Sequence, residues 1–337
     1  SIGGVGSLTG SANFAGSASS SNVGDSTTDI SGAVSQLIDI DGLEATADLN
    51  VASDAGISGL AAVDLGSSAE STSGGYAFAS AQAGTLQGAE LGATDIGGVG
   101  SVAGETSLTS GAASSNVSGQ AISLSQLTTA EGLQQTGELD VKSDASVQGL
   151  ANVSSSADAA TTAGTATANA LSTTINGADL AAGNLDIGGI GSIAGQANFG
   201  LSATSSNVSD TSTATADSAE ATGLIGKATN FTTEPDTFGI DVASDSGLSG
   251  MAIGSLTADA SSTAGIAEAT AGAADSAIGA VLPSLNVGGI SDLTGAAQLD
   301  SSATASNVGT STLGATAKAG EGQDVTGLTS GESGENF

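Results

Sequence analysis

A nine-residue motif occurs four times along the chain. Residues 2–10 read Ile-Gly-Gly-Val-Gly-Ser-Leu-Thr-Gly, and related copies begin at Ile96, Ile187 and, more loosely, Val287, in steps of 94, 91 and 100 residues. A second marker, Asn-Val, starts 20 residues after the opening residue of each copy. Self-similarity at a nearly fixed period indicates a repeat architecture, in which each unit buries its apolar face against its neighbours.

A related motif lies between these copies. Residues 53–60 (Ser-Asp-Ala-Gly-Ile-Ser-Gly-Leu) match 143–150 and 244–251, and their core resembles residues 4–8, so the smallest unit is expected to span about 45–50 residues. The units, in order, are A1 (about 1–51), B1 (52–95), A2 (96–141), B2 (142–186), A3 (187–242), B3 (243–286) and A4 (287–337). The expected organisation is therefore three repeats, 1–95, 96–186 and 187–286, and a terminal half-repeat, 287–337. An unpaired A4 would suit addition to the next molecule.

Alternating apolar and polar residues predict strands. Leu43, Ala45, Ala47, Leu49 and Val51 alternate with polar residues, and Gly pairs punctuate such runs as turns or bulges would. We therefore expect an all-β chain, built as a β-solenoid or as stacked β-sheet units with a core of Gly, Ala and Ser. Tandem small β-sandwich units are the alternative, but they usually need a bulky aromatic core, and aromatic residues make up 2% of this chain.

Two Ala-rich segments allow a different local structure. Residues 264–282 contain few β-branched residues and precede Pro283, and residues 159–171 are similar but richer in Thr. Since Ala has the highest helix propensity, either segment could be helical. Helical B units would make the fold a mixed repeat.

Small side chains limit the burial energy of such a chain. Burying a Leu, Ile or Phe contributes about 1.5–3 kcal/mol, whereas ordering one residue costs about 1–2 kcal/mol of backbone entropy. With 52 Gly and abundant Ala and Ser, the core barely offsets that entropy. Dense backbone hydrogen bonding and contacts with neighbouring copies are the expected additional sources of stability.

The charge excludes several partners. The chain has 3 Lys and no Arg against 35 Asp and Glu, for a net charge of −32. Nucleic acid and anionic membrane surfaces both need clustered cations, so neither is expected. No stretch approaches the 18 consecutive apolar residues of a transmembrane helix, which argues against membrane insertion. A chain that begins at Ser1 is consistent with a removed leader, so we expect an extracellular or cell-surface location.

The residue types do not favour an enzyme. His and Cys are absent, which removes the usual general base and thiol nucleophile. Paired carboxylates could hydrolyse glycosides, but such sites normally lie in aromatic-lined clefts. We expect no catalytic residues and no organic cofactor.

Calcium is the one metal that the sequence suggests. Acidic residues recur with a four-residue spacing beside a turn, and oxygen ligands clustered at repeat corners suit Ca²⁺. The candidate ligands are Asp54, Asp140, Asp144, Asp241 and Asp245. In the competing interpretation, these Asp residues cap turns or keep a sheet edge soluble.

These patterns favour a secreted structural protein that self-assembles into an extracellular filament, sheath or surface layer, with copies of itself as partners. The alternative is a repetitive adhesin or phage tail-fibre segment that binds a surface receptor or glycan. Its best candidate tip is the irregular insertion at residues 222–238, which concentrates scarce aromatic residues.

Overall fold

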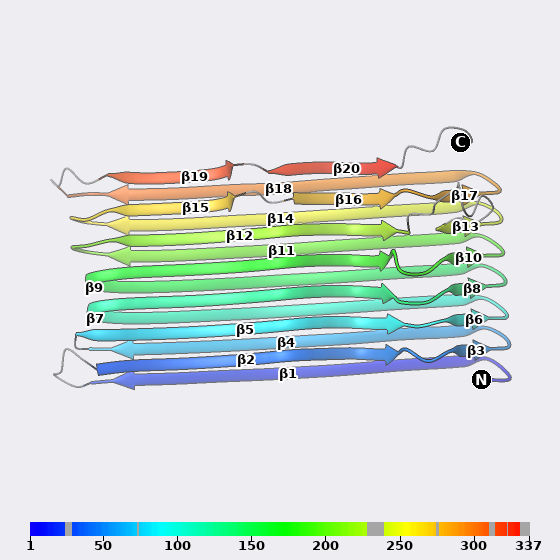
Figure 1. The fold of residues 1–337 in the computed structure, drawn as a ribbon, viewed down its shortest axis with the longest axis horizontal. Coiled ribbons are helices and arrows are strands. Elements are labelled where there is room, and N and C mark those ends of the chain that lie inside the picture. Colours follow the sequence, from blue (N-terminus) through cyan, green and yellow to red (C-terminus); the bar gives the residue numbers. More distant parts are fainter. Residues whose placement is uncertain are drawn as a thin grey trace.

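The chain winds into a β-solenoid. The computed structural model describes residues 1–23, 29–72, 74–227, 239–273, 276–309, 314–321 and 323–330. Within these ranges the coils stack along one axis from the N-terminus to the C-terminus (Figure 1). Every strand pair of the described residues is parallel. The alternative of tandem sandwich units, which are built from antiparallel sheets, is therefore wrong.

The coils contribute to three sheets, two of long strands and one of short strands. Sheet 1 contains β1 (Gly6–Asn22), β4 (Ala55–Ser71), the first halves of β7 (Gly100–Gln135) and β9 (Ala145–Leu180), β11 (Gly191–Asn207), β14 (Ser246–Ser262) and β18 (Ser291–Asn307). Sheet 2 contains β2 (Asp29–Ala45), β5 (Gly75–Leu91), the second halves of β7 and β9, β12 (Ser212–Gly226), β15 (Ala267–Ala273) with β16 (Ser276–Leu282), and β19 (Ala315–Glu321) with β20 (Asp324–Ser330). Sheet 3 contains β3 (Leu49–Val51), β6 (Thr94–Ile96), β8 (Leu139–Val141), β10 (Leu185–Ile187), β13 (Ile240–Val242) and β17 (Leu285–Val287).

The strands of successive coils are in register. Sheet 1 contains seven strands in the described part of the chain, and we number the coils 1 to 7 in that order. Coils 1, 3, 5 and 7 carry the A motif and coils 2, 4 and 6 the B motif. In sheet 1 the register steps lie between 45 and 55 residues, as from Ala55 to Gly100 and from Gly191 to Ser246. One coil therefore corresponds to one A or B unit.

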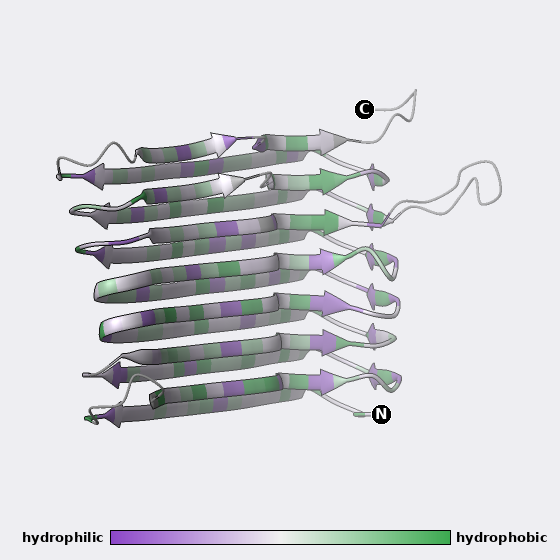
Figure 2. Ribbon diagram, turned by 60° about the vertical axis from the view of Figure 1, so that its left-hand side comes forward, coloured by the Kyte–Doolittle hydropathy of each residue, from purple (hydrophilic) through white to green (hydrophobic). Residues whose placement is uncertain are grey.

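The interior is divided into two apolar clusters. Sheets 1 and 2 face each other, and sheet 3 closes one edge of the coil (Figure 2). Between the long sheets the core is rich in Ala, including Ala79, Ala121 and Ala168, which are fully buried. Beside sheet 3, Leu, Ile and Val such as Leu139 and Ile187 fill the wider space between three walls. Ala thus predominates between the long sheets, among larger residues such as Leu108 and Phe199, and Leu, Ile and Val predominate beside sheet 3.

A line of glycines separates these clusters, and we call it the glycine spine. In sheet 1 the glycines are paired coil to coil, and they are Gly10, Gly59, Gly104, Gly149, Gly195, Gly250 and Gly295. They face Gly42, Gly88, Gly132, Gly177, Gly223, Gly279 and Gly327 of sheet 2. A Cβ at Gly149 would lie 2.0 Å from the carbonyl oxygen of Gly177. The two sheets therefore touch through their backbones along this line.

The expected helical segments are strands. Residues 264–282 contain β15 and β16, and residues 159–171 lie within β9. No helix forms in the residues that the structure describes. Ala168, Ala170, Ala269 and Ala271 are buried almost completely between the long sheets. Packing in this narrow interior outweighs the helix propensity of Ala, which is only a weak preference.

Candidate assembly surfaces

Both ends of the stack present open strand edges. Among the described residues β1 pairs only with β4 and β2 only with β5, while β18, β19 and β20 pair only with strands of coil 6. β1 and β18 each offer a 17-residue edge. An unpaired strand presents a row of backbone donors and acceptors, which is a template for pairing with another chain.

The apolar interior is also open at these ends. Leu8, Leu37 and Leu43 in coil 1, and Leu293 and Leu299 in coil 7, contact the two apolar clusters but are only partly buried. Terminal repeats of a solenoid usually need a polar cap to keep the stack soluble. The described ends of this stack expose core residues instead.

The A and B coils meet through a specific contact at the turn after sheet 3. Asp54 of coil 2 accepts a hydrogen bond at 2.8 Å from the backbone N–H of Val99 in coil 3. The same contact joins Asp144 to Ile190 and Asp245 to Ile290, also at 2.8 Å. Three of the five calcium candidates therefore cap turns, as the competing interpretation expects.

The turn at the opposite end of the long strands carries a second contact, which also joins an A coil to the B coil before it. The Asn116 side-chain amide of coil 3 donates to the carbonyl oxygen of Gly75 in coil 2 at 3.0 Å. Asn207 and Asn307 make the equivalent contacts with Gly164 and Gly265. These Asn residues are the marker found 20 residues into each A unit. In every case an A coil binds the B coil on its N-terminal side.

Loss of one turn cap should weaken the stack modestly. Asp144→Ala leaves the Ile190 N–H without its acceptor, and we expect a loss of about 1 kcal/mol of unfolding free energy. Asp144→Asn retains a side-chain oxygen and should lose less than half as much. Urea unfolding followed by circular dichroism measures both. Equal losses for the two variants would contradict the assignment of the cap.

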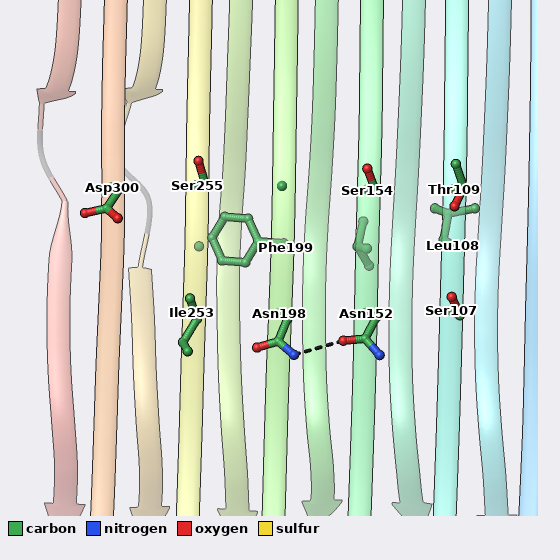
Figure 3. Close-up of a pocket in the computed structure, with 13 residues that line it drawn as sticks. Ser107, Leu108, Thr109, Asn152, Ser154, Asn198, Phe199, Ile253, Ser255 and Asp300 are labelled. Atoms are coloured by element: carbon green, nitrogen blue, oxygen red, sulfur yellow. Dashed lines mark hydrogen bonds between the residues drawn. The ribbon is translucent and has the colours of Figure 1, made fainter.

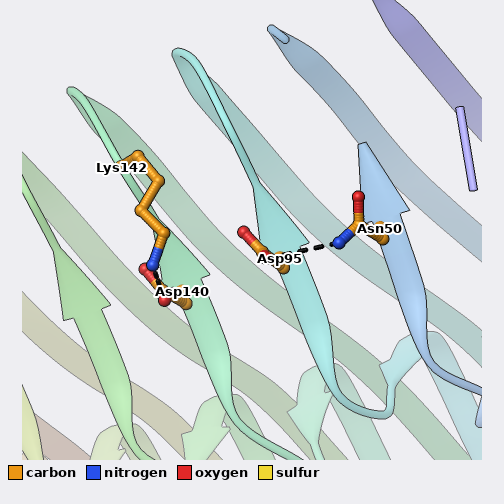
Figure 4. Close-up of polar contacts among 4 residues, drawn as sticks. All are labelled: Asn50, Asp95, Asp140 and Lys142. Carbon is orange, nitrogen blue, oxygen red and sulfur yellow. Dashed lines mark hydrogen bonds and ion pairs between the residues drawn. The ribbon is translucent and has the colours of Figure 1, made fainter. Parts of the chain in front are cut away.

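The other two calcium candidates lie on sheet 3. The outward residues of its strands are in register and read Asn50, Asp95, Asp140, Asp186, Asp241 and Asn286. Asn50 donates to Asp95 at 3.3 Å, and Lys142 pairs with Asp140 (Figure 4). Asn286 donates to Asp241 at 3.1 Å. We call this row the Asp ladder. Adjacent strands lie about 4.8 Å apart, so four like charges are stacked.

The ladder perturbs its central carboxylate. Burial raises the pKa of Asp186 to about 6, and the neighbouring charges of Asp241, Glu138 and Asp140 add to this effect. Sequence reasoning placed Asp140 and Asp241 beside Asp144 and Asp245, but the fold separates ladder from turn. In the described residues no three acidic side chains are gathered where they could hold one metal ion. Calcium binding stays a prediction.

The outer face of sheet 2 carries an apolar patch in coils 1 to 3. Ile30, Val34, Ile38 and Tyr76 are 71%, 54%, 78% and 47% exposed, and Phe78, Ile122 and Leu124 beside them are half-buried. Residues 30–38, 76–84 and 120–128 contain no charged residue. Exposed apolar patches of this kind mark interaction sites.

The outer face of sheet 1 is polar and nearly flat. A shallow groove of about 390 Å³ crosses it over coils 3 to 7 (Figure 3). Asn198 donates to Asn152 at 2.9 Å along it, and Phe199 fills the space that Gly254 leaves below. Asp300 is the one carboxylate among the described lining residues.

The insertion proposed as an adhesive tip lies mostly outside the described residues. Thr222 to Gly226 end β12, and Lys227 donates to the side-chain oxygen of Asn184 at 2.9 Å. Residues 228–238 are not described.

No protein-family model, curated protein or solved structure matches this chain. Within the described ranges there is no helix with the length and apolarity that crossing a membrane requires.

Proposed function

We propose that the chain is a secreted structural protein that self-assembles into an extracellular filament, sheath or surface layer. The observation that carries this proposal is the pair of open ends of the described stack, where in-register parallel strands and half-buried leucines face outward. Stacking one molecule on another would continue the three sheets and cover both apolar clusters.

Charge opposes this stacking and gives it a salt dependence. The net charge is −32, and surface charges act over about 8–10 Å at physiological ionic strength. Added salt screens this repulsion, and divalent cations reduce it further at the Asp ladder. Assembly should therefore strengthen as either is raised.

Negative-stain electron microscopy across a salt and calcium titration tests the proposal. Seven coils at the usual strand spacing give an axial length of about 34 Å for each molecule. We expect filaments or sheets with that repeat, more abundant at 0.5 M than at 0.05 M NaCl. Single particles under every condition would overturn self-assembly.

The apolar patch favours a second candidate, a repetitive adhesin or tail-fibre segment. Tyr76 and Phe78 form an uncharged apolar face on an otherwise acidic molecule, and aromatic side chains are frequent in receptor and glycan contacts. If this function holds, glycan-array or cell-binding signals should fall when both are replaced by Ser. Thr213→Ser and Thr215→Ser, on the same face in coil 5, are the matched control.

A further inference from the structure

The glycines of the A turns are required by the coil beneath them. A Cβ at Gly98, Gly189 or Gly289 would lie 2.2, 2.2 or 2.3 Å from the Oδ1 atom of the capping Asp in the preceding B coil. The glycine before each of these is equally confined. At Gly97, for example, a Cβ would lie 2.6 Å from the carbonyl oxygen of Ala52. Distances this short exclude any side chain.

Coil 1 has glycine at both of these positions, although no preceding coil of the described stack confines them. Gly3 and Gly4 occupy the same two positions, and a Cβ on either would meet nothing within 4 Å. Neither has the positive φ that would favour glycine. Val5 is 77% exposed. Its counterparts in the later A coils donate their backbone N–H groups to the capping Asp, and they are Val99, Ile190 and Ile290.

The polarity of the contacts identifies the missing neighbour. Asp caps and Asn amides join A2, A3 and A4 to the B coil on the N-terminal side of each, so B1 pairs with A2, B2 with A3 and B3 with A4. By these contacts A1, and not A4, is the A unit whose B coil is absent from the described stack.

We propose that the N-terminal face of coil 1 is a docking site for a B-type coil, one whose turn presents Ser-Asp to Val5. The incoming carboxylate would lie over Gly4 and accept the Val5 N–H. The proposal rests on the proposed function only in treating the ends of the stack as interfaces. The C-terminal end of this chain fits the site incompletely, because Ile290 occupies the position of the Asp.

The full chain with Ile290→Asp is the probe, because it gives the C-terminal end the missing carboxylate. Ile290 is 78% exposed, so the change leaves the core intact. A hydrogen bond to a charged group corresponds to roughly a tenfold change in affinity. We therefore expect end-to-end association, measured by sedimentation velocity in 0.5 M NaCl, to be about tenfold tighter than for the control Ile290→Ser. Ile290→Asn, which adds no charge beside Asp245, should give a smaller gain.

Gly4→Ala tests the receiving side. Combined with Ile290→Asp it should abolish the gain, while the unfolding midpoint of the monomer stays unchanged because the added Cβ has open space. Equal association of the Asp, Asn and Ser variants, or a gain that survives Gly4→Ala, would overturn the docking site.

The outcome separates the two proposals. If the unaltered chain stays monomeric but Ile290→Asp associates through Gly4, the docking site stands and the homopolymer falls. Filaments of the unaltered chain that gain nothing from Ile290→Asp would show the reverse.

Discussion

Gly149→Ala should destabilise the solenoid by at least about 3 kcal/mol, beyond the usual cost of overpacking a core. The new Cβ would lie 2.0 Å from the Gly177 carbonyl oxygen and 2.8 Å from the Cα atom of Ala178. Both obstacles belong to backbone held in β9, so no side chain can move aside. Separating the sheets to admit the methyl group would loosen both apolar clusters.

Gly200→Ala is the matched control. It lies in the next strand of sheet 1, on the outer face, where a Cβ would meet nothing within 4 Å. Its effect should stay within about 0.5 kcal/mol, and a slight gain is expected because Ala restricts the unfolded chain. Denaturant unfolding by circular dichroism measures both variants. Similar midpoints for the two would disprove the backbone contact between the sheets.

The glycine spine explains how a chain with so few large side chains folds. Backbone contact brings the long sheets close enough for Ala to fill the space between them, as Ala121 and Ala168 do. Larger residues such as Leu65 and Leu127 are interspersed among the Ala residues there, and they predominate beside sheet 3. Parallel pairing of every coil adds the dense backbone hydrogen bonding that the composition requires.

Much of this fold could be predicted from the sequence. Alternation within the repeat indicated strands, and the scarcity of aromatic residues favoured a solenoid over a sandwich. The helical alternative for residues 264–282 was wrong because helix propensity describes only the local preference of Ala. It does not include the packing of these Ala side chains between the two long sheets. The spine itself was visible as a glycine at the same place in every unit, such as Gly10 and Gly59, but its partner in sheet 2 depends on how the coil closes.

The assembly surfaces were harder to predict. The four-residue spacing of Asp140 and Asp144 suggested one cluster, yet these residues serve different rows of the stack. Nor does the order of units along the chain show which neighbours bind each other. The direction of the Asp54 contact, toward the coil that follows, appears only when register and turn geometry are known.

Acidification from pH 7.5 to pH 5.0 should stabilise the folded chain, against the usual behaviour of carboxylates. The pKa of Asp186 is about 6 in the folded chain and has a reference value of 3.8. The folded state therefore binds a proton before the unfolded state does, so stability rises as the pH falls through 6 and levels off below about 4. Burial also raises the pKa of Glu131, which accepts hydrogen bonds from Gln87 and Asn176.

The variant Asp186→Asn tests whether the stacked carboxylates of the Asp ladder, rather than the net charge of the chain, cause this pH dependence. It places mid-ladder the residue type that Asn50 and Asn286 already provide at the ends. After allowance for solvent screening at this half-exposed group, we expect a gain of about 1 kcal/mol at pH 7.5. The gain should fall to roughly half at pH 5.0, where the folded chain has bound the proton but the unfolded chain has not, and it should vanish only below about pH 4. Asp64→Asn, on the outer face of sheet 1, removes the same charge away from the ladder. If both variants gain equally at pH 7.5, relief of net charge and not the stacked carboxylates governs the response, and the ladder is not a source of strain.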